Sequence, residues 1–461
     1  MTPSPGSSAS RNRFLGRDRE LEFLTELWDS GRPELFVLYG RRRVGKTELL
    51  QRFCSGRKSV YFLAAQVRDR DNLRALRQSI AGELGDKLAG EVEFPDWSSA
   101  LGFLAERAGD ERVAVVLDEF PYLCEANASV PSQIQRFWDT RGKNSSLMLV
   151  LCGSQVSFME KEVLAEKSPL FGRRTAQRRL EPISPTDAIA FFPKWSMRER
   201  VLAYSILGGM PAYLQRFDDS RTIRENLLRE VLRPEGFLFD EAHFLLRSEL
   251  TTPATYNSLL AAVARGAQKL NDIALEVGVD STTANKYLHT LRELRLVERE
   301  TPLTDPDPLR SRRGVYRIAD RFLAFHFRHV QPHVSLIHAG RGERVFEQFV
   351  EPDFERLYDE ARVEFVLDHL RREGAEALGD EIPDIARHSG AYVRAVARTS
   401  SGRPVAAIVL PDGKSSMAKL AQELETLEAA FGAKLIKLNY GLTDRPDRPV
   451  EVERVPDGEL V

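Results

Sequence analysis

The chain has 461 residues, of which 42% are hydrophobic and 29% are charged, and its formal net charge at pH 7 is −2. This near-neutral balance gives no overall attraction to nucleic acid or membrane, and no apolar run approaches the ~20 residues that span a bilayer. The length exceeds what one hydrophobic core supports, so about three domains are expected.

The N-terminal stretch MTPSPGSSASRNR lacks the apolar segment of a signal peptide, and residues 1–10 are expected to form a disordered tail. The three cysteines, Cys54, Cys124 and Cys152, are scattered singly along the chain. This spacing fits neither a metal site nor a disulfide framework and favours a reducing, cytoplasmic location.

Residues 11–185 alternate short apolar runs with amphipathic helical stretches. The runs ELFVLYG, SVYFLAA, VAVVLDEF and LMLVLCG are apolar on both faces. Such runs are typical of fully buried strands in a parallel sheet, and their alternation with helices predicts an α/β domain.

The first apolar run leads into the phosphate-loop pattern G-x-x-x-x-G-K-[ST]. The strand before it and the helical run ELLQRF after it place backbone N–H groups and a helix N-terminus around a phosphate group. Lys46 is expected to contact the β- and γ-phosphates of ATP, and Thr47 to bind Mg²⁺ through its hydroxyl. The predicted ATP-binding residues are Gly40, Arg41, Arg42, Arg43, Val44, Gly45, Lys46, Thr47 and Glu48.

Polar residues follow two further strands. Asp118 ends VAVVLD and is expected to hold Mg²⁺, while the adjacent Glu119 is expected to orient and polarise the attacking water. The run LMLVLCG continues into Ser154 and Gln155, with Ser154 preferred as a residue that senses the γ-phosphate. A hydrolytic site is therefore predicted.

The remaining chain divides into three predicted parts. Residues 186–240 read as a small helical lid, 241–319 as a winged helix-turn-helix, and 320–461 as a separate small α/β domain. The recognition helix is expected from Ser281 to Leu294, with an outer face made of Thr283, Asn285, Lys286 and His289. This helix carries few cations, although the loop 309–313 is more basic, so DNA is one candidate partner and a hinge or protein contact is the other.

These motifs together resemble the archaeal-type ATPase family, a branch of the STAND class of AAA+-related P-loop NTPases. The resemblance rests on FLGRDREL, the phosphate loop, LDEF, CGSQ, SPLFGRRT and LGGMPAYL in that order, and it extends through the winged helix. It implies a fold with a P-loop parallel sheet, a helical lid in which a Gly-x-Pro segment lies near the nucleotide, a winged helix and a C-terminal α/β domain.

The resemblance also implies further site residues. Gly16 and Arg17 would lie near the adenine or ribose, and Arg173 would neutralise γ-phosphate charge in cis or from a neighbouring subunit. Arg174, Arg178 and Arg179 are alternatives for this arginine finger.

Members of the family often carry a restriction-endonuclease-like C-terminal domain, whose metal chemistry needs closely placed carboxylates and a lysine. One alignment builds such a site from Glu347, Asp384, Asp412 and Lys414. The favoured alignment places the strand pair YVRAVARTSSGRPVAAIVL at the core, where acids are absent, and predicts a degenerate, nuclease-like binding domain.

The sequence thus predicts an ATPase with ATP and Mg²⁺ as cofactors, driving a conformational switch or remodelling of a protein or DNA partner, without membrane attachment. The alternatives are a DNA-binding regulator with a non-hydrolysing nucleotide switch and an ATP-gated, metal-dependent nuclease. A homo-oligomer would be needed for an arginine finger acting in trans.

Overall fold

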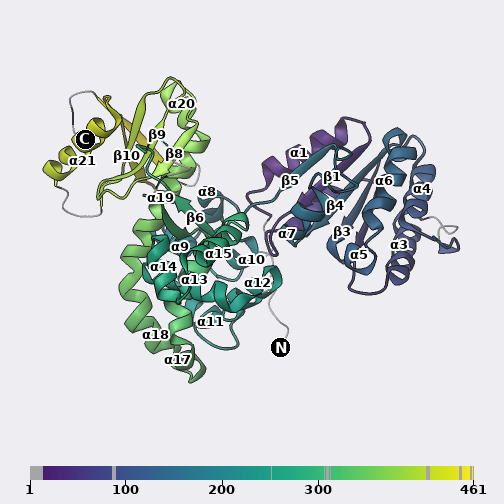
Figure 1. The fold of residues 1–461 in the computed structure, drawn as a ribbon, viewed down its shortest axis with the longest axis horizontal. Coiled ribbons are helices and arrows are strands. Elements are labelled where there is room, and N and C mark those ends of the chain that lie inside the picture. Colours follow the sequence, from purple (N-terminus) through teal and green to yellow (C-terminus); the bar gives the residue numbers. More distant parts are fainter. Residues whose placement is uncertain are drawn as a thin grey trace. The chain divides into compact units, whose positions relative to one another are not determined.

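The computed structural model describes residues 14–85, 90–250, 252–305, 307, 311, 313–411, 416–445, 449–456 and 459. They form two compact units, which are coloured by sequence in Figure 1. The first comprises Phe14–Ile183 with Met210–Ala212, and the second comprises Ser184–Gly209 with the chain from Tyr213 onward. The predicted tail of residues 1–10 lies outside the described residues, and the predicted boundaries at 240 and 319 fall inside the second unit.

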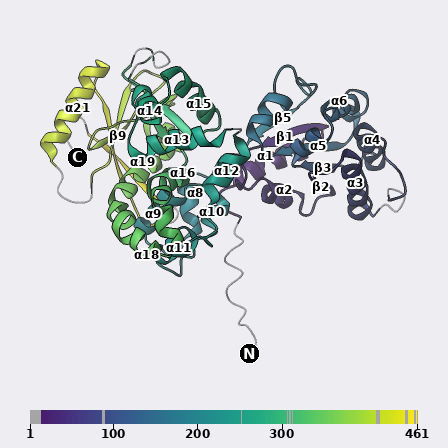
Figure 2. The same cartoon turned by 60° about the horizontal axis from the view of Figure 1, so that its bottom comes forward.

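The first unit is built on a five-stranded parallel sheet, with helices packed around it (Figures 1 and 2). Every residue of the three central strands is buried, as their apolar sequences predict. In spatial order the strands are β2 (Ser59–Leu63), β3 (Val113–Asp118), β4 (Leu147–Gly153), β1 (Glu34–Tyr39) and β5 (Ala176–Arg179). The helices are α1 (Asp18–Asp29), α2 (Lys46–Cys54), α3 (Asp69–Leu84), α4 (Trp97–Ala108), α5 (Phe120–Ala126), α6 (Val130–Thr140) and α7 (Val156–Phe158), which continues as a π-helical turn, Met159–Val163.

The second unit begins with the helices predicted as a lid. Two of them start with a capping box, in which Ser196 pairs with Glu199 and Thr222 with Glu225, so their first N–H groups are satisfied by side chains. The helices are α8 (Pro185–Ala188), α9 (Met197–Leu207), α10 (Pro211–Leu214), α11 (Ile223–Glu230) and α12 (Glu241–Glu249).

A winged helix-turn-helix follows, as predicted. Gly278 takes a left-handed conformation (φ 76°) between the second and third helices, and the Asp280 carboxylate caps the third by accepting from the N–H groups of Thr282 and Thr283. The elements are α13 (Pro253–Arg265), α14 (Leu270–Val277), α15 (Ser281–Glu293) and the antiparallel pair β6 (Val297–Glu300) and β7 (Val315–Ile318).

The C-terminal part forms a second five-stranded sheet in the order β12-β11-β10-β9-β8. Only the pair β10–β11 is parallel, and the helix α21 (Met417–Phe431) connects these two strands. The strands are β8 (Asp384–Arg387), β9 (Val393–Arg398), β10 (Pro404–Ile408), β11 (Ile436–Leu442) and β12 (Val450–Val455). Upstream lie α16 (Arg321–Phe325), α17 (Val334–His338), α18 (Gly342–Val345), α19 (Phe354–Arg372) and α20 (Gly374–Leu378), with short π and 3-10 turns between α16 and α19. The α/β class with these parts confirms the predicted fold.

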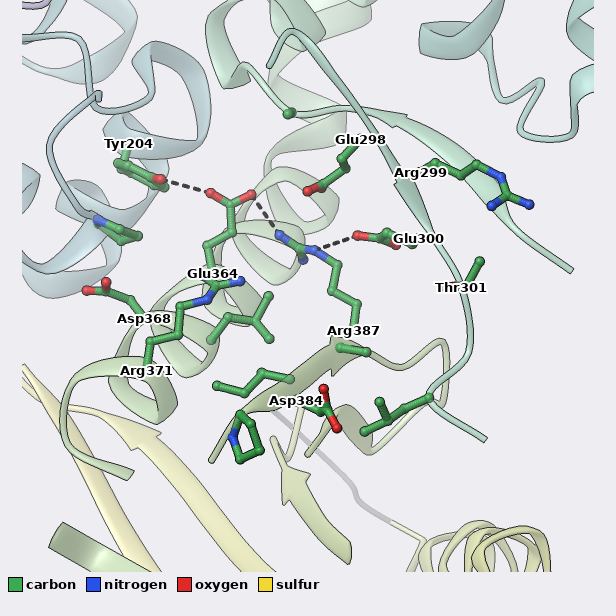
Figure 3. A pocket seen from close by; sticks show the side chains of 17 residues that line it. Tyr204, Glu298, Arg299, Glu300, Thr301, Glu364, Asp368, Arg371, Asp384 and Arg387 are labelled. Carbon is green, nitrogen blue, oxygen red and sulfur yellow. Dashed lines mark hydrogen bonds and ion pairs between the residues drawn. The ribbon is translucent and has the colours of Figure 1, made fainter. Parts of the chain in front are cut away.

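An ionic cluster inside the second unit connects the winged helix to the C-terminal sheet (Figure 3). Glu364 of α19 is its centre: its carboxylate accepts from the Tyr204 hydroxyl at 2.8 Å and from the Arg387 guanidinium at 2.9 Å, and it pairs with Arg321. Arg387 also lies 3.0 Å from Glu300 of the wing strand β6. These groups line or adjoin a cavity of about 540 Å³.

Burial would raise the pKa of Glu364, but the charges of Arg321 and Arg387 and the hydrogen bond from Arg321 outweigh it and lower the pKa to about 2. A carboxylate whose pKa is lowered by folding stabilises the folded state above its unfolded pKa, near 4.5, and loses that contribution as the pH falls toward 2.

Glu364→Gln should therefore lower the free energy of unfolding by about 3–5 kcal/mol at pH 7, because it removes the negative charge that the buried Arg321 and Arg387 share. The gap between wild type and variant should narrow as the pH falls below about 4.5, and denaturant unfolding at several pH values measures it. Glu355→Gln is the matched control on the same helix, since Glu355 is 75% exposed in its pair with Arg198 and should cost about 1 kcal/mol or less. Equal losses in the two variants would contradict this account.

Candidate nucleotide site at the carboxyl edge of the parallel sheet

The parallel register brings the predicted site residues to one edge of the first sheet. Tyr39, at the end of β1, is level with Gly153 at the end of β4, and Leu63 of β2 is level with Asp118 of β3. The segments that follow these strands therefore share the edge where open α/β sheets bind ligands.

The phosphate loop between β1 and α2 depends on close backbone packing. A Cβ atom on Gly40 would lie 2.4 Å from the Leu180 carbonyl oxygen, so only glycine fits there. Gly45 has φ 95°, also a conformation that favours glycine. The Lys46 side chain is buried and its Nζ donates to the carbonyls of Gly40 at 2.7 Å and Arg41 at 3.0 Å. The Lys46 side chain thus donates to carbonyls of the phosphate loop. It is predicted to contact the phosphates that this loop binds.

The Asp118 carboxylate is the meeting point of the site. It is 1% exposed, and its Oδ2 accepts from the Thr47 hydroxyl at 2.8 Å and from the Tyr61 hydroxyl at 2.6 Å. Its Oδ1 accepts from the backbone N–H of Glu119 at 2.9 Å. Burial, followed by the charge of Asp118, raises the pKa of Tyr61 well above its ordinary value, so the phenol keeps its proton as a donor.

The Asp118–Thr47 pair fits the chemistry of Mg²⁺. A carboxylate and a hydroxyl provide the hard oxygen ligands that this ion prefers, and they lie beside the phosphate loop. Within the described residues no group of three or more His, Cys, Asp or Glu side chains forms a metal cage. Proteins usually hold Mg²⁺ with one or two side chains together with substrate phosphates and water.

Glu119 adopts an unusual backbone conformation. Its φ of 54° and ψ of 44° place a non-glycine residue in the left-handed region, at the turn from β3 into α5. The side chain accepts a hydrogen bond from the Ser154 hydroxyl at 2.7 Å, and Ser154 is buried at the end of β4. The structure thus brings together the predicted water-orienting carboxylate and the preferred sensor residue. Gln155, the second choice, donates to Glu125 at 3.0 Å.

The three loop arginines have different surroundings. Arg41 is buried, Arg42 donates to the Tyr122 hydroxyl of α5 at 2.7 Å, and Arg43 has a positive φ of 68°. Val44 is fully buried, and burial raises the pKa of Glu48. At least one arginine therefore fixes the loop to the helix that follows Glu119.

Arg17 lies against the phosphate loop. Its guanidinium is buried and donates to the carbonyl of Val44 at 2.8 Å and to that of Glu181 at 2.7 Å. The preceding Gly16 has φ 68°. Through these contacts Arg17 holds the phosphate loop against the chain segment after β5. The resemblance did not imply this structural role. Contact of Gly16 and Arg17 with the adenine or ribose stays a prediction.

Arg173 lies at the opposite edge of the sheet. Its Nη2 pairs with an Asp139 oxygen at 2.9 Å, and Thr175, two residues later, donates to the carbonyl of Leu35 near the start of β1. The phosphate loop follows the far end of that strand, about 17 Å away at ~3.3 Å per residue. This distance argues against action in cis and leaves action of Arg173 from a neighbouring subunit as a prediction.

Of the alternative arginines, Arg179 is nearest the loop edge. It is level with Tyr39, and its guanidinium pairs with Glu160 at 3.0 Å and Glu181 at 3.1 Å. Arg178 lies over the Phe23 ring, and Arg174 donates to the Leu164 carbonyl at 3.2 Å.

The Gly-x-Pro segment predicted to lie near the nucleotide is found beside the phosphate loop. Met210–Ala212 belongs to the first unit, and the Pro211 ring lies 3.8 Å from where a Cβ on Gly45 would be. The chain on both sides of this segment belongs to the second unit.

Two tyrosines of the site were missed by sequence reasoning. Tyr61 lies on β2, whose only chemical signal was an apolar strand pattern, and Tyr122 lies in α5. The sequence signal for Tyr61 is its position just before the carboxyl end of a strand that lies beside β3. This signal can be used only when the order of the strands in the sheet is known.

The winged helix and the C-terminal sheet carry the other predicted sites. On α15, Leu288 and Leu291 are buried, while Asn285, Lys286 and His289 are exposed, and the Thr283 hydroxyl donates to Asp280. In the C-terminal sheet β9 and β10 carry no acidic residue, and Asp384 is exposed at the start of β8. Asp412, Lys414 and most of the loop 309–313 lie outside the described residues.

Comparison with known proteins gives two matching family models. Residues 14–217 match the ATPase domain found predominantly in Archaea, and residues 258–301 match the IclR helix-turn-helix domain. Among described residues, no helix is both long and apolar enough to span a bilayer.

The chain is also similar to individual proteins. It is 34% identical over 329 residues to an uncharacterized protein of Methanocaldococcus jannaschii, covering 71% of each chain. A 45-residue stretch is 49% identical to an uncharacterized ATP-binding protein of the same organism, covering 10% of this chain and 76% of that protein. The structure of the Walker-type ATPase of Pyrococcus abyssi aligns with a TM-score of 0.51 and 20% identity over 68% of this chain and 95% of that chain, which supports the same fold.

Gly40→Ala should destabilise the first unit and weaken nucleotide binding, because the new methyl group overlaps the Leu180 carbonyl, which is main chain and cannot rotate away. A loss of about 1–3 kcal/mol is expected in thermal or denaturant unfolding. Gly82→Ala is the control: this glycine is inside α3 with open space around it, so the change should be neutral or stabilising by up to about 1 kcal/mol. A fully stable Gly40→Ala protein would show that the loop packs differently.

Proposed function

Because the chain belongs to the family whose ATPase domain is found predominantly in Archaea, we propose that it binds ATP with Mg²⁺ and hydrolyses it to drive a conformational switch or the remodelling of a partner. The observation that carries this proposal is the set of contacts linking Thr47, Asp118, Glu119 and Ser154 at one sheet edge. A loop that only clamps nucleotide does not need a carboxylate beyond the metal ligand.

Each residue has a distinct task in the proposed reaction. Lys46 and the backbone N–H groups of the loop bind the phosphates, and Thr47 and Asp118 hold Mg²⁺, which supplies charge neutralisation when bound. Glu119 accepts a hydrogen bond from the water that attacks the γ-phosphorus and so orients it in line with the leaving ADP. Ser154 fixes the Glu119 side chain through its hydrogen bond and senses whether the γ-phosphate is present.

The left-handed conformation of Glu119 supports this assignment. A non-glycine residue in that region costs about 1–3 kcal/mol and persists only where neighbouring structure enforces it. Such strain is concentrated at functional sites, and the carboxylate of this residue accepts a hydrogen bond from Ser154.

The route from nucleotide to partner runs through Met210–Ala212. Pro211 lies beside the phosphate loop at Gly45, whereas the chain on either side belongs to the second unit with its winged helix. A rearrangement of the loop on ATP binding or hydrolysis is thereby transmitted along the covalent chain in both directions. The partner that responds, whether DNA, another protein or a second copy of the chain, belongs to this proposal.

Two substitutions separate binding from hydrolysis. Lys46→Ala should abolish ATP binding, while Glu119→Gln should retain binding and lower turnover by about 10²-fold or more, since the amide is no base for the attacking water. Calorimetry with ATP and a phosphate-release assay measure the two properties. Normal turnover in Glu119→Gln would remove that residue from the mechanism.

A second candidate function is ATP-controlled DNA binding. It is favoured by the match to a helix-turn-helix family and by the exposed outer face of α15, which presents Asn285, Lys286 and His289. Contacts to phosphate would give a DNA affinity that falls as salt rises.

If α15 binds DNA, Lys286→Ala should weaken the affinity for duplex DNA and reduce the slope of log K against log salt by about 1. Fluorescence anisotropy over a range of KCl concentrations measures both. Lys419→Ala, at an exposed position of α21, is the control and should change neither. Wild-type protein without salt-dependent DNA binding would exclude this second function.

A further inference from the structure

Tyr61 shares its partner with the predicted Mg²⁺ site. Its hydroxyl lies 2.6 Å from Asp118 Oδ2, the same oxygen that accepts from Thr47 at 2.8 Å. The backbone N–H of Glu119 occupies the other carboxylate oxygen at 2.9 Å. Asp118 is thus held from three sides, by the end of its own strand, by the phosphate loop and by the neighbouring strand β2.

We propose that Tyr61 is a positioning residue of the ATPase site, which holds the Asp118 carboxylate in the orientation needed to bind Mg²⁺. This inference rests on the proposed function. In the proposed function, Tyr61 contacts neither the nucleotide nor the attacking water, and it acts only through Asp118.

The fold explains how a strand residue reaches this place. In the β2–β3 register Leu63 is level with Asp118, and Tyr61 precedes Leu63 by two residues, so the two side chains lie on the same face. A tyrosine spans the resulting offset of about 6.6 Å along the strand and brings its hydroxyl to the end of β3. Tyr61 is also fixed at its backbone, since its N–H donates to the Glu83 carboxylate of α3 at 2.7 Å.

Tyr61 and Thr47 donate to the same carboxylate oxygen. In the proposed function the Thr47 oxygen would bind Mg²⁺ through a lone pair, while its hydroxyl proton can still donate to Asp118 Oδ2. Tyr61 adds a second donor to that oxygen from β2, the strand paired with β3, and partners of this kind orient metal ligands. With these donors and the N–H of Glu119, the Asp118 carboxylate keeps one orientation.

The test compares nucleotide affinity with and without metal, using the full chain and the non-hydrolysable analogue adenylyl-imidodiphosphate. Calorimetric titrations are made in Mg²⁺ and in EDTA for wild type and for Tyr61→Phe. Substituting a residue that donates a hydrogen bond to a metal ligand typically lowers the metal affinity by about 10- to 100-fold. Tyr61→Phe should therefore weaken affinity in Mg²⁺ by about 10-fold or more and leave affinity in EDTA within about twofold of wild type.

Tyr204→Phe is the matched control. It also removes a tyrosine hydroxyl that donates to a buried carboxylate, Glu364 at 2.8 Å, but in the second unit. It should leave both affinities unchanged.

The outcomes distinguish the inference from the function on which it rests. If wild type shows no gain in affinity from Mg²⁺, the proposed function fails. If wild type shows the gain and Tyr61→Phe retains all of it, the inference about Tyr61 is wrong. Loss of affinity in EDTA to the same extent as in Mg²⁺ would also overturn it, because Tyr61 would then support the loop and not the metal ligand.

Discussion

The hydrogen bond between the Thr47 hydroxyl and the Asp118 carboxylate joins two segments that are 71 residues apart in sequence. It requires that the loop after β1 and the end of β3 meet at one edge, although β4 separates these strands in the sheet. The loop can approach because Gly40 leaves room for the Leu180 carbonyl and because Arg17 holds its Val44 carbonyl from behind. The remaining groups of the site are arranged around this contact: Glu119 follows Asp118, and Ser154 reaches Glu119 from the end of β4.

Much of this arrangement could be predicted from local pattern. The central strands are apolar on both faces, which is typical of a covered parallel sheet, and the phosphate loop fixes where the first strand ends and α2 begins. Asp118, Glu119 and Ser154 are identified because polar residues directly follow buried strands, and parallel strands end at one edge.

Other features depend on pairings between distant strands, which local pattern does not contain. The motif predicts Arg173 as an arginine finger, but its position at the edge opposite the phosphate loop follows only from the parallel pairing of β5 with β1. Tyr61 gave no signal because its role follows from the order of β2 beside β3. The charges around Glu364 come from α16, α19, β6 and β8, and no local pattern within any one of these elements predicts that they meet.

The central claim is that the site hydrolyses ATP and does not merely bind it. Its most direct test is the release of phosphate in a single turnover, with the full chain in excess over ATP and Mg²⁺ added to start the reaction. The account predicts that wild type releases phosphate in an exponential phase that EDTA prevents, and that Asp118→Asn loses this phase. The claim would be contradicted if the wild-type protein left its bound ATP intact for as long as protein and ATP remain associated, both with and without DNA.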